Sequence, residues 1–398
     1  MSDQSATRVP RILCLDGGGV RGLSSLLILH ELMEDIEVRT GAEETPKPCE
    51  YFDLIGGTST GGLIAIMLGL LGMVILSNFA STDPQSVTEC IDAYRIMSKE
   101  IFAVDHVLAG KVPVGDDQCR FDFSTLEEKV QQLVELRLGD KDHLMSAKPK
   151  PPKTVTQCRT FVVAQMANDV TSVPTLFRSY TVEGVSRTRC KIWEAARATS
   201  AAPSFFKPMT IDHLAPITYV DGALGWNNPA GLALVEAQRI WNVNNKDVCL
   251  VSIGTGQQSA ASILNESLLE NDLETQRSLF TQMRSSLSSV ASTIIPYWNT
   301  AKNIPPGILA LLKMAGALTR VVTNTEAVHD ALEREADQRF PYFRFNVERN
   351  VGDIGLEDWR KVQSLASHTT AYMSTAELER KKIMCTKCVL DPSHFNRK

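Results

Sequence analysis

Apolar residues in the N-terminal part of the chain follow two alternating patterns. Arg11 to Asp16 (RILCLD) is a short, nearly continuous apolar run, as in a buried strand, and Leu23 to Ile36 has apolar residues at helical spacing. Tyr51 to Gly56 (YFDLIG) is a second such run, and it enters a glycine-rich turn, GTSTG, at 57–61. The pattern predicts two units of strand, tight turn and helix.

The second helix is predicted in a long apolar run, Gly62 to Leu76, which continues to about Ala80 with only Ser77 and Asn78 polar. Its length is borderline for a membrane span. However, neither flank carries basic anchors, and the run starts directly on the glycine turn. We therefore predict a buried helix.

The same two patterns recur further along the chain. We predict buried strands over Thr160–Ala167 and Lys246–Ile253, a short strand over Thr218–Val220, a helix over Trp193–Ser200, mostly helical structure over Ile263–Leu312 and a charged amphipathic helix over Gly355–Lys382. Strands that alternate with helices are typical of an α/β fold, here three α/β/α layers with a mainly parallel central sheet.

Composition and charge narrow the classes of function. Of the 398 residues 43% are hydrophobic, enough for a large core, and a net charge of −5 without a long basic run argues against a nucleic-acid partner. The nine cysteines do not resemble a secreted disulfide framework, and Met1 to Pro10 lacks the apolar core of a signal peptide. We therefore expect a reducing, intracellular setting, in the cytoplasm. Cys385 and Cys388 form one CxxC, but with only His394 nearby we expect ordinary thiols and no metal site.

The GTSTG turn is the strongest chemical signal. A serine on a sharp turn between a strand and a helix is exposed to substrate, and the free N–H groups of the helix N-terminus point at the same place. Ser59 is therefore a candidate nucleophile, and Gly57 and Gly61 allow the tight turn.

A second glycine-rich turn, DGGGVRG at 16–22, follows the first predicted strand. A dinucleotide-binding turn needs an acidic residue roughly twenty positions on, and Glu34, Asp35 and Glu37 lie too early or inside the predicted helix. No Gly-Lys-Ser/Thr follows, which excludes a Walker A loop. The other use of such a loop is an oxyanion hole, in which consecutive glycine N–H groups face the oxygen that becomes negative.

A third turn, Asp221-Gly222-Ala223, exposes an aspartate after a short predicted strand. In this order the three turns resemble those of the patatin-like phospholipases, and most of all the fungal-type patatin domains. Other stretches agree with the resemblance: EAARATSAAPSFFKP at 194–208, YVDGALGWNNP at 219–229, VSIGTG at 251–256, YFRFNVE at 342–348 and GLEDW at 355–359. The resemblance covers roughly Arg11 to Met373.

The resemblance implies a Ser–Asp dyad without histidine, in which Ser59 attacks an ester carbonyl and Asp221 accepts the serine proton. It assigns the oxyanion hole to Gly17, Gly18, Gly19 and Arg21, and the surrounding motif positions to Gly22, Gly57, Gly61, Gly222 and Ala223. The implied protein is a lipid acyl hydrolase of the phospholipase A or lysophospholipase type that needs no cofactor and no metal ion. Its implied partners are a lipid ester substrate and, transiently, a membrane or lipid-droplet surface.

The implied organisation is one patatin-like catalytic domain over residues 8–375 and a C-terminal tail over 376–398. Within this domain Val74 to Gln85 (VILSNFASTDPQ) interrupts the family pattern before a Glu-Cys-Ile-x-x-Tyr helix. Valine and glutamine codons can supply the two ends of an intron, so we hypothesise a retained intron, which a sequenced transcript tests. The alternative is a genuine loop in which Ile75, Leu76 and Phe79 touch lipid.

Other interpretations stay open. A Ser–His–Asp triad would use His329 or His368, and neither lies in a recognisable motif. A catalytically weak, lipid-sensing or regulatory module is the non-enzymatic alternative, because a fold does not fix a function. The sequence also leaves open which lipid ester is cleaved, and whether the acyl group passes to water or to another acceptor.

Overall fold

The structure of the protein is a computed structural model. It describes residues 9–75, 90–105, 119–148, 155–169, 173–185, 188–203, 205–212, 215–243, 247–257, 325–336, 340–348, 351–352 and 354–392. The predicted helical stretch Ile263–Leu312 lies outside these residues. So does the insertion at 74–85, apart from Val74 and Ile75.

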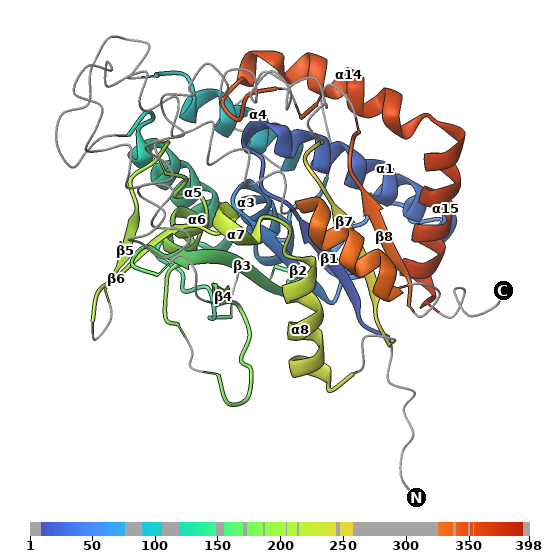
Figure 1. The fold of residues 1–398 in the computed structure, drawn as a ribbon, viewed down its shortest axis with the longest axis horizontal. Helices are drawn as coiled ribbons and strands as arrows, with labels where there is room; N and C mark the ends of the chain where they lie inside the picture. Colours follow the sequence, from blue (N-terminus) through green and yellow to red (C-terminus); the bar gives the residue numbers. More distant parts are fainter. Residues whose placement is uncertain are drawn as a thin grey trace, which may run out of the picture.

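One mixed sheet of eight strands organises the described part of the chain (Figure 1). The strands are β1 (Arg11–Leu15), β2 (Leu54–Thr58), β3 (Arg159–Met166), β4 (Thr175–Arg178), β5 (Met209–Ile211), β6 (Ile217–Asp221), β7 (Cys249–Ile253) and β8 (Tyr342–Phe345). Their order is β5-β6-β3-β2-β1-β7-β8, with β4 beside β3. The pairs β3–β2, β2–β1, β1–β7 and β7–β8 are parallel, whereas β4 and β6 run antiparallel to β3.

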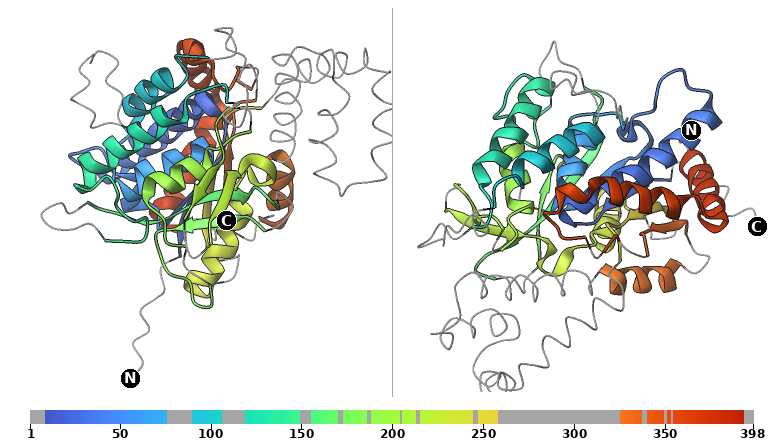
Figure 2. Two further views of the ribbon diagram at one scale, coloured as in Figure 1. Left: turned by 90° about the vertical axis from the view of Figure 1, so that its left-hand side faces the viewer. Right: turned by 90° about the horizontal axis from the view of Figure 1, so that it is seen from above.

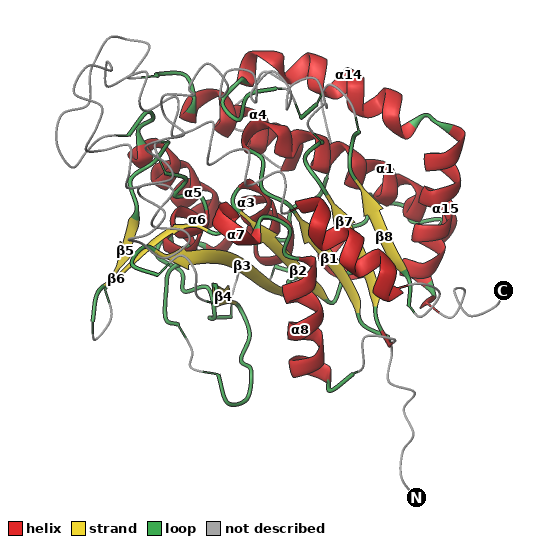
Figure 3. Ribbon diagram, in the orientation of Figure 1, coloured by secondary structure: helices red, strands yellow, loops and turns green. Residues whose placement is uncertain are grey.

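Helices cover both faces of this sheet (Figures 2 and 3). They are η1 (Gly19–Arg21), α1 (Gly22–Thr40), α2 (Pro48–Tyr51), α3 (Thr60–Ala65), the π-helical η2 (Ile66–Leu70), α4 (Cys90–Ile101), α5 (Phe123–Leu138), α6 (Ile192–Thr199), α7 (Ala223–Trp226), α8 (Ala230–Trp241), a helix at 325–336, η4 (Trp359–Lys361), α14 (Val362–Met373) and α15 (Ala376–Leu390).

Side chains of β1 alternate between the two faces, as a pleated strand requires. Leu13 and Leu15 join a core with α1, α3, α4, α5, α6, α14 and α15, while Ile12 and Cys14 pack toward α8 and the helix at 325–336. All four side chains are fully buried. The three α/β/α layers and the mainly parallel sheet are therefore confirmed.

The predicted strands at 11–16, 160–167, 218–220 and 246–253 correspond to β1, β3, β6 and β7, and the helix at 193–200 corresponds to α6. The strand predicted at Tyr51–Gly56 is shifted, because Pro48 begins the short helix α2 and β2 starts only at Leu54.

Two predicted helices end or break differently. The apolar run after Ser59 is helical only to Leu70, because Gly72 turns the chain with φ 56° and the Met73 N–H bonds back to the Met67 carbonyl. The stretch Gly355–Lys382 is two helices, α14 and α15. Thr375 separates them, since its hydroxyl accepts a hydrogen bond from the Leu378 N–H and caps α15.

The segment expected to be a C-terminal tail contains α15, and its buried face belongs to the core that includes α1. Leu378, Cys385, Cys388 and Val389 contribute its buried apolar side chains.

The start of the insertion is also buried. Ile75 is fully enclosed, so it is not the exposed lipid contact that the loop alternative suggested. In the described part of the chain, no helix combines the length and apolar character needed to cross a bilayer.

Candidate active site

Ser59 lies on a strained turn between β2 and α3. Its φ of 55° and ψ of −127° are unusual for a residue with a side chain, and it is the N-cap residue of α3. The turn packs so tightly that a Cβ atom at Gly61 would lie 2.2 Å from the Leu15 carbonyl oxygen, and one at Gly57 would lie 2.0 Å from the Gly61 carbonyl oxygen. Both motif glycines are therefore required by close backbone contacts.

Sheet register brings Asp221 to the level of Ser59. Thr58, the last residue of β2, pairs with Val163, and Asp221 pairs with Ala164, the next residue of β3. The Ser59 hydroxyl donates a hydrogen bond of 2.6 Å to Asp221 Oδ2. Although β6 runs opposite to β2, it ends where the turn after β2 begins.

The DGA turn holds the Asp221 carboxylate from the other side. The Ala223 N–H donates to Asp221 Oδ1 at 2.8 Å, and a Cβ atom at Gly222 would lie 2.5 Å from the Val163 carbonyl oxygen. Asp221 is only 1% exposed. Burial raises the pKa of Asp221 to about 7, although the hydrogen bonds from Ser59 and Ala223 oppose this rise. The carboxyl group thus titrates near neutral pH, as a general base should.

The Gly17–Gly19 loop follows β1 and lies beside Ser59, because parallel β1 and β2 end at the same edge of the sheet. A Cβ atom at Gly17 would approach the Ser59 Cβ to 2.8 Å. The Gly17 N–H faces the Asn227 carbonyl at 3.4 Å, and the Gly18 N–H donates to Thr60 Oγ1 at 3.0 Å. Among the described residues the Gly19 N–H has no acceptor.

Carbonyl groups of the same loop are also fixed. The Gly17 carbonyl accepts hydrogen bonds from Thr255 Oγ1 at 2.8 Å and from Asn227 Nδ2 at 3.3 Å. The Gly19 carbonyl accepts one from the Tyr94 hydroxyl. The loop is therefore held at each of its three residues.

Arg21 is buried beneath this loop. Its Nε donates to the Gly18 carbonyl at 3.2 Å and its Nη1 to the Gly352 carbonyl at 2.7 Å. The neighbouring Gly22 is needed for packing, since a Cβ atom there would lie 2.6 Å from the Tyr94 hydroxyl. These contacts show that Arg21 braces the backbone of the glycine loop.

Sequence reasoning missed several residues that support Ser59 and the loop. Thr199 Oγ1 accepts a hydrogen bond from the Ser59 N–H at 2.9 Å and donates one to the Val163 carbonyl at 2.6 Å. Thr60, Asn227 and Thr255 hold the glycine loop. All four lie inside motifs noted in the sequence, but a threonine or asparagine in a turn gives no sign of the distant group that it binds.

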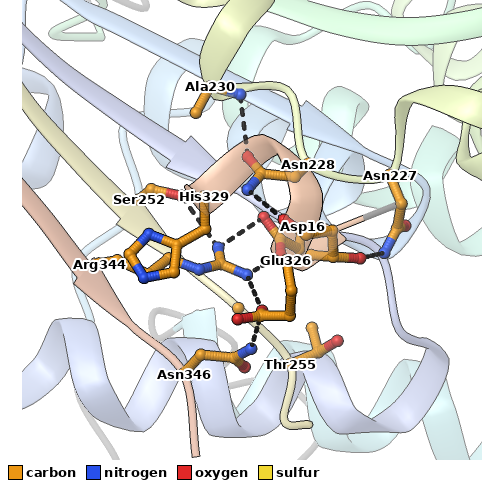
Figure 4. A network of polar contacts seen from close by, with 12 residues as sticks. Asp16, Asn227, Asn228, Ala230, Ser252, Thr255, Glu326, His329, Arg344 and Asn346 are labelled. Carbon is orange, nitrogen blue, oxygen red and sulfur yellow. Dashed lines mark hydrogen bonds and ion pairs between the residues drawn. The ribbon is translucent and has the colours of Figure 1, made fainter. Parts of the chain in front are cut away.

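Neither histidine of the alternative Ser–His–Asp triad, both of them described by the structure, is hydrogen-bonded to Ser59. His329 Nδ1 is 3.1 Å from the Tyr342 hydroxyl, and Figure 4 shows the imidazole beside Arg344. His368 lies on α14. The Ser59 hydroxyl instead bonds directly to Asp221. No group of three His, Cys, Asp or Glu residues in the described ranges is placed to hold a metal ion.

Comparison with known proteins identifies the family. The family model described as patatin-like phospholipase matches residues 13–234, more than half of the chain. Human calcium-independent phospholipase A2-gamma is 30% identical over 390 residues, which cover 94% of this chain and 39% of that protein. The mouse protein of the same name is 30% identical over 71% of this chain and 31% of its own length. Patatin-like protein 2 of Arabidopsis thaliana is 28% identical over 89% of this chain and 79% of its own.

The chain therefore spans between 31% and 39% of the length of these two phospholipase A2-gamma relatives. The match includes all three turns, with Ser59, Asp221 and the Gly17–Gly19 loop inside the matched region. The chain belongs to the patatin-like phospholipase family.

Proposed function

We propose that this chain is a lipid acyl hydrolase of the phospholipase A or lysophospholipase type, in which Ser59 and Asp221 form the catalytic dyad. One observation carries the proposal: a serine on a strained turn donates a 2.6 Å hydrogen bond to a buried carboxylate whose pKa is raised to about 7. An adjacent base is what turns a weakly nucleophilic hydroxyl into a catalytic one.

In the first half of the reaction, Ser59 Oγ attacks the carbonyl carbon of the ester while Asp221 Oδ2 accepts the hydroxyl proton. The tetrahedral intermediate then collapses. The bond to the alcohol oxygen breaks, and the departing alcohol takes the proton from Asp221. In the second half, water attacks the acyl-Ser59 ester, Asp221 accepts a water proton and returns it to Ser59, and the fatty acid leaves.

The negative oxygen of the intermediate needs hydrogen-bond donors that are already in place. The Gly19 N–H and the N-terminus of α3 serve this role best, because the Gly17 and Gly18 N–H groups already face the Asn227 carbonyl and Thr60 Oγ1. Arg21 supports the oxyanion hole through the Gly18 carbonyl. Of the residues assigned from the sequence, Gly19 is therefore proposed as the donor, and Gly17, Gly18 and Arg21 as its support.

The relatives named phospholipase favour a phospholipid ester as substrate, and those named calcium-independent favour a reaction without a metal ion. Each chemical step above uses only protein groups and water. We infer transient contact with a membrane or lipid-droplet surface, since that is where such esters reside, and a cytoplasmic location.

A panel of phospholipid, lysophospholipid, galactolipid and triacylglycerol esters tests the proposal, assayed with and without EDTA. The wild type should release fatty acid from at least one class. Ser59→Ala and Asp221→Ala should lose about 10³-fold or more of that activity, because the members of a catalytic unit fail together. The matched control His329→Ala should keep it.

The lipid-sensing alternative predicts a different outcome. A folded wild type that binds lipid, but neither hydrolyses any ester nor reacts with a fluorophosphonate at Ser59, would rule out the enzymatic proposal. Loss of activity in His329→Ala with retention in Asp221→Ala would replace the dyad by a triad.

A further inference from the structure

A buried ion pair includes the residue that directly precedes the glycine loop in the sequence. Arg344 on β8 reaches across to Asp16, the residue before Gly17, with Nη1 3.0 Å from Oδ1 and Nη2 2.6 Å from Oδ2 (Figure 4). Arg344 is 4% exposed and Asp16 1%. Two parallel contacts of this kind fix direction as well as distance.

Neighbouring groups hold Arg344 in turn. Its Nη1 also donates to Ser252 Oγ at 2.9 Å, and its Nη2 lies 3.3 Å from Glu326 Oε1. Glu326 Oε1 also accepts a hydrogen bond of 2.8 Å from Asn346 Nδ2. The guanidinium group therefore has few other orientations open to it.

The same network reaches the loop by a second route. Asn346 Oδ1 accepts a hydrogen bond of 2.7 Å from the Gly256 N–H, and the preceding residue, Thr255, donates to the Gly17 carbonyl at 2.8 Å. A Cβ atom at Gly18 would lie 2.2 Å from Thr255 Oγ1, so Thr255 packs against the loop as well. Figure 4 shows Asp16, Arg344, Glu326, Asn346 and Thr255 in one cluster.

The groups that hold Asp16 and Gly17 in these two routes come from Thr255, Arg344 and their neighbours, all beyond residue 234, where the match to the family model ends. The catalytic residues come from the matched part of the chain, but part of the support of the glycine loop comes from β8, the helix at 325–336 and the turn after β7.

The opposite charges of Asp16 and Arg344 also favour this pairing. Burial raises the pKa of Asp16 to about 6, and Arg344 opposes that rise, so the carboxyl group stays mostly ionised at neutral pH. Two buried charges are a poor source of stability in themselves, because desolvation offsets their attraction. The pair is therefore better explained by the orientation that its two contacts impose on Asp16 than by its contribution to stability.

We infer that Arg344 and Thr255 are positioning residues, which hold Asp16 and Gly17 so that the Gly19 N–H meets the transition-state oxygen of the Ser59 reaction. Neither residue touches the substrate in this scheme. The inference rests on the proposed function, and it predicts that their loss lowers kcat and leaves substrate binding intact, since the donor acts on charge that develops only in the transition state.

Kinetics with a soluble p-nitrophenyl ester test this inference, with kcat expressed per Ser59 labelled by a fluorophosphonate. Arg344→Met should lower kcat on the order of 10²-fold, the effect of a catalytic group displaced by about 1 Å, with KM nearly unchanged. Thr255→Val, which removes one hydrogen bond and keeps the shape, should lower kcat about tenfold. Arg344→Lys should recover part of the loss, because it restores the charge without the paired contacts.

Arg178→Met is the matched control. Arg178 forms a similar two-contact ion pair with the fully buried Glu236 of α8, at 2.5 and 2.9 Å, in the region of β4. Its loss should reduce thermal stability and leave kcat per labelled serine unchanged. If Arg344→Met does not fold, Arg344→Lys and Thr255→Val decide the question.

Wild-type kcat per labelled serine in the Arg344 and Thr255 variants would overturn the inference. So would equal losses in Arg344→Met and Arg178→Met, because these would reflect the shared loss of a buried ion pair. Failure of the proposed function is a separate outcome: the wild type would then hydrolyse no ester, or Ser59→Ala would hydrolyse it equally well.

Discussion

The Asp221 carboxyl group is buried, yet the proposed reaction requires its ionised form. An acid whose pKa is higher in the folded than in the unfolded chain binds its proton more tightly when folded. The stability that it contributes is therefore fully present at low pH and is lost as the pH rises. For Asp221 this loss should run from about pH 4, near the ordinary carboxyl pKa, to about pH 7, the raised pKa.

Asp221→Asn should therefore abolish ester hydrolysis and stabilise the fold above neutral pH. Asparagine still accepts the Ala223 N–H but carries no charge. Its advantage over the wild type should grow by about 3 kcal/mol between roughly pH 4.5 and pH 8. Urea unfolding at the two pH values measures the difference. Asp16 titrates in both proteins, so its contribution cancels.

Ser59→Ala is the control for this prediction, because it is also inactive but keeps the buried carboxyl group. Its unfolding free energy should retain the wild-type fall with pH. A difference between Asp221→Asn and wild type that is the same at both pH values would show that Asp221 does not titrate as the burial implies.

Residues of the site could be predicted only where neighbours in sequence form a motif. Ser59, Asp221 and the glycine loop each lie in such a turn, and the structure brings them together. The supports could not be predicted in the same way. Thr255 is separated from Gly17 by 238 positions and Arg344 from Asp16 by 328, so only the sheet order β1–β7–β8 makes them neighbours.

At the scale of elements, the hydrophobic pattern predicted five of the eight strands, missed β4, β5 and β8, and placed helix ends poorly. The apolar run after Ser59 continues to Leu76, so hydropathy alone gives no end to the helix. The end is set by one backbone conformation, the positive φ of Gly72. Helix α5 was not predicted, although its five buried side chains recur at helical spacing.

Two glycines that end helices provide a test of this view. Gly72 and Gly41 have φ of 56° and 64°, and a Cβ atom would meet the Thr156 carbonyl oxygen at 2.6 Å in the first and nothing within 4 Å in the second. Gly41→Ala should cost about 1 kcal/mol, for the backbone conformation alone. Gly72→Ala should cost clearly more, because the surrounding backbone must also move.

Urea denaturation of both variants measures these costs. Equal losses of unfolding free energy would show that the steric contact at Gly72 adds no measurable cost. Either variant leaves Ser59 and Asp221 in place, so loss of stability should not be accompanied by loss of labelling of Ser59 in the folded protein.

At the scale of the whole molecule, the sequence placed a boundary at residue 375, whereas the core continues through α15. Lys382 pairs with Glu31 of α1 at 3.1 Å, and the Val389 carbonyl accepts a hydrogen bond from Arg11, the first residue of β1, at 3.3 Å. The strand that leads into the glycine loop is thus tied at its start to the last helix.

A chain that ends at Thr375 should therefore lose stability severely. It lacks the buried side chains of Leu378, Cys385, Cys388 and Val389, and uncovers the side of α1 on which they pack. At 1.5 to 3 kcal/mol for each large apolar side chain, the loss is about 5 kcal/mol or more, comparable with the whole stability of many domains.

The matched control ends at Pro392 and removes only residues beyond the described helix. We expect it to remain soluble and to melt at the temperature of the full chain, whereas the chain ending at Thr375 should be insoluble or melt far lower. Equal melting temperatures for the two chains would show that α15 does not stabilise the domain. Because α15 reaches the start of β1 and β8 reaches its end, the catalytic domain would need the chain well beyond residue 234.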